Sequence, residues 1–141
     1  MLSTPESSST GITLEKPLSV IVADDVMEIQ ALVEMWLKEI GCAVKCASSG
    51  REVSKLLRQA PCDLVIADVI MPDGDGLDVI LELKQAKAKT RVLAISGGGR
   101  HLQASDCLKF ARGLGAHEVL LKPFNREQLL SAVRRVTQAG N

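Results

Sequence analysis

Leu64-Val-Ile-Ala-Asp68 is an uninterrupted apolar run that ends in a carboxylate, near the middle of a chain of 141 residues. Two more short apolar runs end in charged residues, Ser19-Val-Ile-Val-Ala-Asp24-Asp25 and Val119-Leu-Leu-Lys122. A run this apolar is typical of a strand covered on both faces, as in a parallel sheet. Because the carboxyl ends of parallel strands open onto one crevice, we expect the charged residues that end the three runs to face one another.

Strand and helix patterns alternate along the chain on both sides of the central run. The segments that read as strands are 18–23, 43–47, 63–67, 91–96 and 118–121. The segments with apolar residues at helical spacing are 29–40, 50–60, 77–83, 101–114 and the stretch after Asn125. Five strands that alternate with five helices predict an α/β fold, a doubly wound parallel sheet with helices on both faces.

Individual residues indicate where the helices end and which face they bury. Gly41 and Gly115 are placed to end two helices, since glycine readily takes the left-handed conformation found there. Asn125 is a good N-cap for the last helix. The helical spacing also places Leu32 and Leu81 on buried faces.

Composition and charge limit the class of protein. Apolar residues make up 46% of the chain and charged residues 24%, which is typical of a globular domain. Acids and bases number 17 each, so a net charge of zero gives no general attraction to nucleic acid or to an anionic membrane. No apolar stretch approaches the roughly 20 residues that cross a bilayer. No signal peptide is recognisable at the N-terminus, so we expect a cytoplasmic protein.

The chain divides into a short tail and one domain. Residues 1–17 are rich in serine and threonine and lack an apolar period, which predicts a disordered N-terminal tail. Residues 18–141 are expected to form one domain, and nothing after the last helix indicates a second. The four cysteines lack Cys-x-x-Cys spacing, and we expect reduced residues near the core rather than disulfides or a zinc site. They are Cys42, Cys46, Cys62 and Cys107.

Asp24, Asp25, Asp68 and Lys122 carry the functional argument together rather than singly. An acidic pair after a strand is more often a cap or a turn than a metal site, and a lone Lys-Pro is usually a solvated charge before a turn. Their joint position, at the carboxyl ends of different predicted strands, is what favours a shared site. Three acids and a lysine gathered there suit a divalent cation and a phosphoryl group.

With these residues the chain resembles the receiver domain of bacterial two-component response regulators, of the stand-alone kind found in chemotaxis. The resemblance runs from Leu18 to about Thr137. The matching pieces are Asp24-Asp25, Asp68 with Met71-Pro-Asp-Gly-Asp-Gly76, Ser96 after the fourth strand, and Lys122-Pro-Phe124. It implies a flavodoxin-like receiver fold whose five strands follow the order 2-1-3-4-5.

The resemblance also implies roles for the acids. Asp68 would be the phosphoacceptor, whose carboxylate attacks the phosphorus of a phosphohistidine in a Mg²⁺-dependent reaction and forms an acyl phosphate. Asp25, Asp68 and the backbone carbonyl of Ile70 would hold the Mg²⁺ directly, and Asp24 would act through water. Crowded acids repel one another without the cation, so we expect the metal-free protein to be less stable than the Mg²⁺ form.

Other residues are implied to contact the phosphoryl group after Asp68 is modified. Lys122 would place its ammonium against one phosphoryl oxygen, and in this family the peptide bond before the equivalent proline is usually cis. Ser96 would donate its hydroxyl to another oxygen. The backbone N–H groups of Val69 and Gly97 are further expected donors.

The sequence departs from the family pattern at two places. Val119 stands where the family usually has an aromatic switch residue, and a valine has no ring to move between exposed and buried positions. Ser96 is followed by Gly97-Gly98-Gly99, and the stretch from there to Lys122 is longer than in chemotaxis relatives. Because glycine has high backbone freedom, we expect this segment to report phosphorylation to the following helix.

The resemblance implies protein partners. A sensor histidine kinase or a histidine phosphotransfer protein would supply the phosphoryl group, and a downstream protein target would receive the signal or the phosphate. No direct contact with nucleic acid or membrane is expected. Relatives usually dock through the fourth helix, fifth strand and fifth helix, where Phe110 is either exposed or a core residue. That face would hold Phe110, Arg112, Val119, Arg134 and Arg135.

Three other interpretations compete with a phosphorylated receiver. A calcium loop at 73–84 lacks its acids, because Leu77 and Lys84 occupy those positions. A phosphohydrolase of the aspartyl-phosphate type needs a second acid two residues beyond its nucleophile, where this chain has Ile70. We therefore expect no enzyme beyond self-catalysed phosphorylation and dephosphorylation. The serious alternative is a receiver-like interaction module that acts without phosphorylation.

Overall fold

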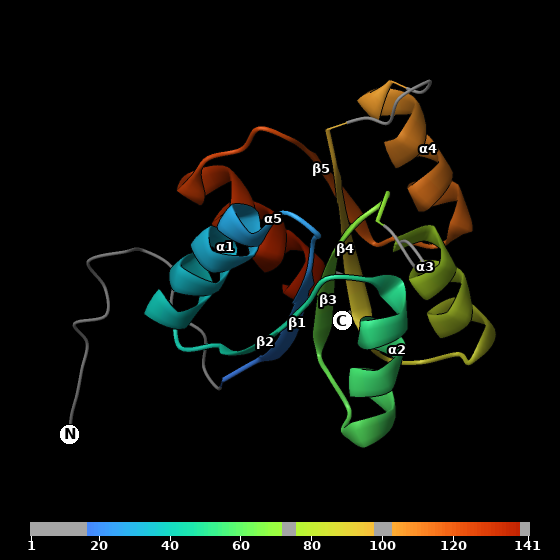
Figure 1. Ribbon diagram of the computed structural model, residues 1–141, viewed down its shortest axis with the longest axis horizontal. Helices are drawn as coiled ribbons and strands as arrows, with labels where there is room; N and C mark the ends of the chain where they lie inside the picture. The colour runs from blue at the N-terminus through green and yellow to red at the C-terminus, as the bar shows by residue number, and fades with distance from the viewer. Residues whose placement is uncertain (1–16, 72–75, 98–102, 139–141) are drawn as a thin grey trace.

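The computed structural model describes residues 17–71, 76–97 and 103–138, and the predicted tail before Pro17 and the glycine segment after Gly97 lie outside them. Strands and helices alternate throughout these residues (Figure 1). The strands are β1 (Ser19–Ala23), β2 (Ala43–Ala47), β3 (Leu64–Asp68), β4 (Arg91–Ser96) and β5 (Glu118–Leu121). The helices are α1 (Met27–Glu39), α2 (Gly50–Gln59), α3 (Gly76–Gln85), α4 (Ala104–Leu114) and α5 (Arg126–Gln138). None of the helices described here has the length and apolar character that crossing a lipid bilayer requires.

All five strands run parallel in the order β2-β1-β3-β4-β5, which confirms the predicted doubly wound sheet. The chain passes outward from β1 to β2 and then crosses back to β3 on the other side of β1. This reversal leaves the carboxyl ends of β1 and β3 side by side. Open α/β sheets bind their ligands at such a switch point.

Helices cover both faces of the sheet: α1 and α5 lie on one face, and α2, α3 and α4 lie on the other (Figure 1). Successive side chains of a strand point to opposite faces, so each central strand contributes to two cores. Val20 and Val22 belong to the core beneath α1 and α5, whereas Ile21 and Ala23 belong to the other. Every residue of β3 is buried, which explains why this run is apolar until Asp68.

The helix ends follow the signals in the sequence. Asn125 caps α5, because its Oδ1 accepts the Gln128 N–H and its own N–H donates to Gln128 Oε1, both at 2.8 Å. This reciprocal pair is a capping box. Gly41 and Gly115, which follow α1 and α4, have φ values of +93° and +129°. These are left-handed conformations that favour glycine, as predicted.

Two predicted core positions are wrong. Leu32 and Leu81 are 42% and 39% exposed. In each helix the buried face is centred elsewhere: α1 buries Gln30 beside Val33, and α3 buries Val79. The spacing of apolar residues misjudged α1 because a polar side chain occupies part of its buried stripe.

The cysteines lie in or near the two cores. Cys42, Cys62 and Cys107 are buried and Cys46 is half-buried. Burial, together with the neighbouring Glu34 carboxylate, raises the pKa of the Cys46 thiol to about 11. A thiol with so high a pKa is protonated and weakly nucleophilic at neutral pH.

Candidate functional site

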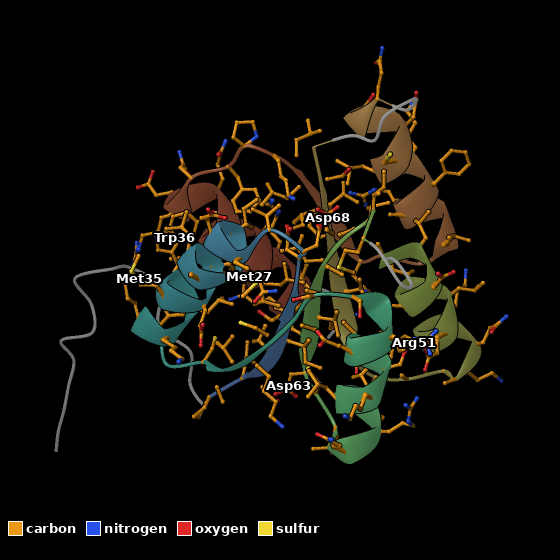
Figure 2. All side chains as sticks on the ribbon, viewed as in Figure 1. Met27, Met35, Trp36, Arg51, Asp63 and Asp68 are labelled. Carbon is orange, nitrogen blue, oxygen red and sulfur yellow. The ribbon has the colours of Figure 1, made fainter. Side chains whose placement is uncertain are left out.

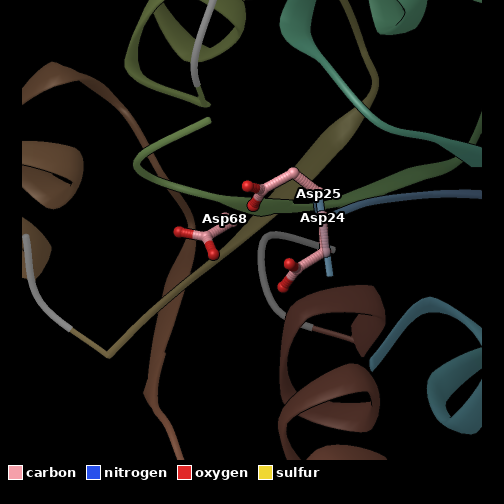
Figure 3. Close-up of side chains that lie close together, drawn as sticks. All are labelled: Asp24, Asp25 and Asp68. Carbon is pink, nitrogen blue, oxygen red and sulfur yellow. The ribbon is translucent and has the colours of Figure 1, made fainter. Parts of the chain in front are cut away.

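Three carboxylates converge at the carboxyl edge of the sheet (Figure 3). Asp24 and Asp25 follow β1 directly, and Asp68 is the last residue of β3. One oxygen from each lies within 4.8 Å of the others. The sheet order produces this cluster, because β1 and β3 are neighbours and their carboxyl ends coincide.

Lys122 extends into the cluster from the end of β5. Its Nζ lies 2.5 Å from Asp68 Oδ2 and 2.7 Å from Asp24 Oδ2. The peptide bond between Lys122 and Pro123 is cis, as the resemblance implies. The structure therefore brings together the three acids and the lysine that the sequence singled out.

Neighbouring residues hold the backbone and stem of Lys122 in place. Its N–H donates to the Ser96 carbonyl oxygen at 2.9 Å, which extends the β4–β5 pairing by one residue. Gly97 lies against the stem of the lysine, where an added Cβ would make an ordinary contact, 3.4 Å from Lys122 Cβ. After the lysine, Phe124 packs edge-on against Trp36 of α1 with ring centroids 6.4 Å apart. Contact with β4 thus holds the lysine backbone, and contact with α1 holds the turn that follows it.

Asp24 is the most buried of the three acids, with no exposed surface. Its Oδ1 accepts the Val26 N–H at 2.9 Å. Its Oδ2 forms an ion pair with the Lys122 ammonium at 2.7 Å, and no other described group donates to it. Buried charges are costly unless they are paired, and here one ammonium is shared by two buried carboxylates, those of Asp24 and Asp68. Hard divalent cations prefer oxygen ligands of this kind, so the residues present fit Mg²⁺.

Asp68 is also buried, with 7% of its surface exposed. Its Oδ1 accepts the Ile70 N–H at 3.0 Å, and its Oδ2 accepts from Lys122. Burial raises the pKa of the Asp68 carboxyl, even though Lys122 and the Ile70 N–H act in the opposite direction. Burial would lower the pKa of Lys122, but the carboxylates of Asp24 and Asp68 outweigh it and raise that pKa. The lysine therefore stays charged.

The other predicted site residues lie at the same edge of the sheet. Ser96 is buried and ends β4, the strand beside β3. Ile70 lies two residues beyond Asp68, and the metal-binding role of its carbonyl stays a prediction. The N–H of Val69 donates to the Ile95 carbonyl oxygen at 2.8 Å. This amide is engaged in the sheet, so the structure does not support it as a phosphoryl donor.

Two residues support the acids from behind: Gly76, which belongs to the segment that carries the resemblance, and Gln30, which the sequence reasoning did not single out as part of a site. Gly76 begins α3 against the backbone of Asp68, and a Cβ there would collide with the Asp68 carbonyl oxygen. Gln30 is buried in α1 and donates to the Asp24 carbonyl oxygen. Gln30 shares a helix face with Val33 and Leu37, at i+3 and i+7, and this spacing could have indicated that the glutamine is buried. The sequence placed Gly76 in the matching segment but did not indicate its close approach to the Asp68 backbone.

One carboxylate links the three elements of the predicted docking face, α4, β5 and α5. Glu118 on β5 accepts from Arg112 of α4 and from Arg135 of α5, both at 3.1 Å. Phe110 is 60% exposed and is therefore not a core residue. It lies two residues from Arg112, about 200° around the helix, and the hollow beside it is lined by residues of α4 alone. Phe110 is thus on the other side of α4 from the arginine.

Val119, the residue at the aromatic switch position, is half-buried and packs against the core beneath α2, α3 and α4. The neighbouring residue Glu118 is partly buried, and burial by itself would raise the pKa of its carboxyl. Hydrogen bonds from Arg135, the Val119 N–H and Arg112 outweigh that effect, and the pKa of Glu118 is lowered. Instead of an aromatic ring, β5 presents the Glu118 carboxylate with its two arginine partners, Arg112 and Arg135, which we call the Glu118 clamp.

Comparison with known proteins places the chain among receivers. Residues 20–134 match the response regulator receiver domain. The chain is 30% identical over 133 residues to the transcription factor SKN7 of Saccharomyces cerevisiae, covering 94% of this chain and 21% of SKN7. It is 34% identical over 114 residues to the response regulator protein TodT of Pseudomonas putida, covering 81% of this chain and 48% of TodT. The chain thus spans less than half the length of these two relatives.

Solved structures share the fold. The chemotaxis response regulator CheY4 of Vibrio cholerae superposes with a TM-score of 0.75 at 29% identity, covering 86% of this chain and 99% of that one. The signal receiver domain of the putative response regulator NarL from Mycobacterium tuberculosis gives a TM-score of 0.76 at 25% identity. That comparison covers 88% of this chain and 98% of the other.

Proposed function

This chain belongs to the response regulator receiver domain family of two-component signalling, and from that premise we propose that it accepts a phosphoryl group from a phosphohistidine onto Asp68. One observation carries the proposal: Asp68 ends a buried strand with its carboxylate beside two more acids and an ammonium. A carboxylate attacks an anionic phosphoryl group only where positive charge offsets the repulsion. In this cluster Lys122 supplies positive charge, and the three carboxylates can bind a cation that supplies more.

In the proposed step, an oxygen of Asp68 attacks the phosphorus of the donor. The bond that forms is the O–P bond of an acyl phosphate. The bond that breaks is the P–N bond of phosphohistidine, whose imidazole keeps the electron pair and takes up a proton. No separate substrate is turned over, so the chain acts as a phosphoacceptor with self-catalysed phosphorylation and dephosphorylation.

The acids would hold the cation that this step requires. Asp24, Asp25, Asp68 and the backbone carbonyl of Ile70 offer the oxygen ligands that Mg²⁺ prefers. When bound, Mg²⁺ supplies positive charge against the phosphoryl oxygens. The excess of negative charge supports this assignment, because buried Asp24 and Asp68 share the ammonium of Lys122.

Lys122 and Ser96 would bind the phosphoryl group after transfer. The Lys122 ammonium already contacts Asp68 Oδ2, and a phosphoryl oxygen on the same carboxyl group lies within reach of a small side-chain movement. The Ser96 hydroxyl belongs to the neighbouring strand end, from which it can donate to a second phosphoryl oxygen.

The phosphoryl donor would be a sensor histidine kinase or a histidine phosphotransfer protein, because both carry phosphohistidine. We propose that a downstream protein binds the basic face around the Glu118 clamp, where Arg112, Arg134 and Arg135 are exposed. Contact with such a partner would pass on either the signal or the phosphoryl group.

Acetyl phosphate with Mg²⁺ tests the proposal on the purified full chain. We expect intact mass spectrometry to show one added phosphoryl group on the wild type and none on Asp68→Asn. The matched control is Asp63→Asn, because Asp63 lies at the other end of β3 (Figure 2) and its side chain accepts the Ser19 N–H, away from the acidic cluster. This control should be phosphorylated like the wild type. An unmodified wild type would instead favour an interaction module that works without phosphate.

A further inference from the structure

Gln30 is a buried polar residue whose side chain contacts the loop that carries the first two acids. It lies in the first turn of α1 and is 5% exposed. Its Nε2 donates to the Asp24 carbonyl oxygen at 2.6 Å and to the Ala47 carbonyl oxygen at 2.9 Å. A third contact, at 3.2 Å, is to Ser48 Oγ. The side-chain amide therefore joins α1 to the carboxyl ends of β1 and β2.

The side-chain amide of Gln30 takes the place of a backbone hydrogen bond at the end of the sheet. The N–H of Asp24 donates to the Ala47 carbonyl oxygen at 3.1 Å, which is the last bond between β1 and β2. β2 ends at Ala47, so the strand itself does not continue opposite the Asp24 carbonyl. Gln30 supplies the N–H group for that carbonyl instead. Because a buried carbonyl needs a donor, the contact is a structural requirement of this strand end.

The bond also restricts how the two acids are oriented. The Asp24 carbonyl belongs to the peptide group that links Asp24 to Asp25, and that group is planar. Fixing its oxygen fixes the plane from which the Asp25 backbone and side chain project. Asp24 is held at its side chain as well, through Val26 and Lys122. For exposed Asp25, the described contacts restrain the peptide group on each side: Gln30 holds the one before it, and the bond from the Val26 N–H to Asp24 Oδ1 holds the one after it.

We propose that Gln30 is a positioning residue for the metal site: by clamping the peptide group between Asp24 and Asp25, it presets the carboxylates for Mg²⁺. This inference rests on the proposed function, since it assumes that these acids bind the cation. Residues that orient metal ligands from behind typically contribute about 10- to 100-fold to affinity. Gln30 contacts neither the cation nor the phosphoryl group in this scheme.

Gln30→Met tests the proposal, because methionine keeps the length and volume of the side chain but cannot donate. We expect the Kd for Mg²⁺, measured by titration calorimetry on the full chain, to rise by about 10-fold or more. Thr90→Val is the matched control. Thr90 is also buried and also donates to a backbone carbonyl, that of Cys62 at 2.7 Å, but it precedes β4 at the opposite edge of the sheet. Its substitution should leave the Kd unchanged.

The free energy of unfolding without metal is measured for each variant, so that loss of stability is separated from loss of affinity. Equal Kd values for folded Gln30→Met and the wild type would overturn the proposal, as would an equal loss in Thr90→Val. If Gln30→Met does not fold, Gln30→Asn decides, because its side chain is one methylene too short to reach both carbonyls. A wild type that binds no Mg²⁺ would overturn the proposed function as well, whereas an unaffected variant of a Mg²⁺-binding wild type overturns only the role of Gln30.

Discussion

The ammonium of Lys122 lies 2.5 Å from a carboxylate oxygen of Asp68, although 54 residues separate them in the chain. The same ammonium faces Asp24 at 2.7 Å. In the described ion pairs of these two buried acids, the positive charge comes from Lys122. The lysine therefore stabilises both carboxylates when no divalent cation is bound. The lysine has two tasks in this interpretation: it stabilises the metal-free fold, and it binds the phosphoryl group after transfer.

Lys122→Met should destabilise the metal-free protein by roughly 3 kcal/mol, because removal of one partner leaves buried carboxylates uncompensated. Mg²⁺ should restore part of this loss, since the cation supplies the missing charge. Urea unfolding with and without Mg²⁺ measures both effects.

Lys38→Met is the matched control for the lysine. Lys38 pairs with Glu34 on the surface of α1 at 2.8 Å, and its side chain is 58% exposed. Exposed pairs of this kind contribute little to stability because water screens them, so the control should change little and should not respond to Mg²⁺. Similar losses in both variants would contradict the central role of Lys122.

The raised pKa of Asp68 predicts a pH dependence of stability. Burial holds this pKa above its ordinary value of 3.8. At pH values between the ordinary pKa and the raised pKa, Asp68 keeps a proton in the folded protein that it has lost in the unfolded chain. Its contribution to stability therefore falls as the pH rises through that interval. Metal-free wild type should therefore lose stability relative to Asp68→Asn as the pH rises from about 4.

Urea unfolding of both proteins at a series of pH values measures this difference. Lys122 and Asp24 face the position in both proteins, so the comparison isolates the carboxyl group of Asp68. Mg²⁺ should reverse the trend, because the cation favours the charged carboxylate. A difference that is independent of pH, or that grows in favour of the wild type, would rule out the raised pKa.

The alternation of patterns predicted the fold because each element obeys a local rule. β2, β4 and β5 begin and end at the predicted residues, since their apolar runs are bounded by turn residues or charges. Helix faces were less predictable. Gln30 interrupts the apolar stripe of α1, and a stripe with one polar member looks displaced around the helix.

The acids of the site were predictable for a different reason. Asp24, Asp25 and Asp68 end strands, and the order of a parallel sheet brings strand ends together whatever the loops do. The support behind them was not predictable, because it depends on distances that no sequence period encodes. The peptide clamp of Gln30 and the close approach of Gly76 to Asp68 are both of this kind.

Gly76→Ala should disturb the site through the backbone alone. Gly76 starts α3, and an added Cβ would collide with the carbonyl oxygen of Asp68, where neither partner is the flexible end of a side chain. Overpacking of this kind costs about 1 to 3 kcal/mol. Because the collision pushes on the residue that we propose is phosphorylated, the rate of phosphorylation by acetyl phosphate should fall together with the free energy of unfolding.

Gly113→Ala separates this close approach from the general effect of replacing a helical glycine. Gly113 lies inside α4, where an added Cβ has no atom within 4 Å. Alanine is favoured over glycine in a helix by about 1 kcal/mol, so this control should be slightly more stable than the wild type and equally phosphorylated. If Gly76→Ala behaved in the same way, the backbone of Asp68 would have room to shift, and the glycine would be an ordinary turn residue without a part in shaping the site.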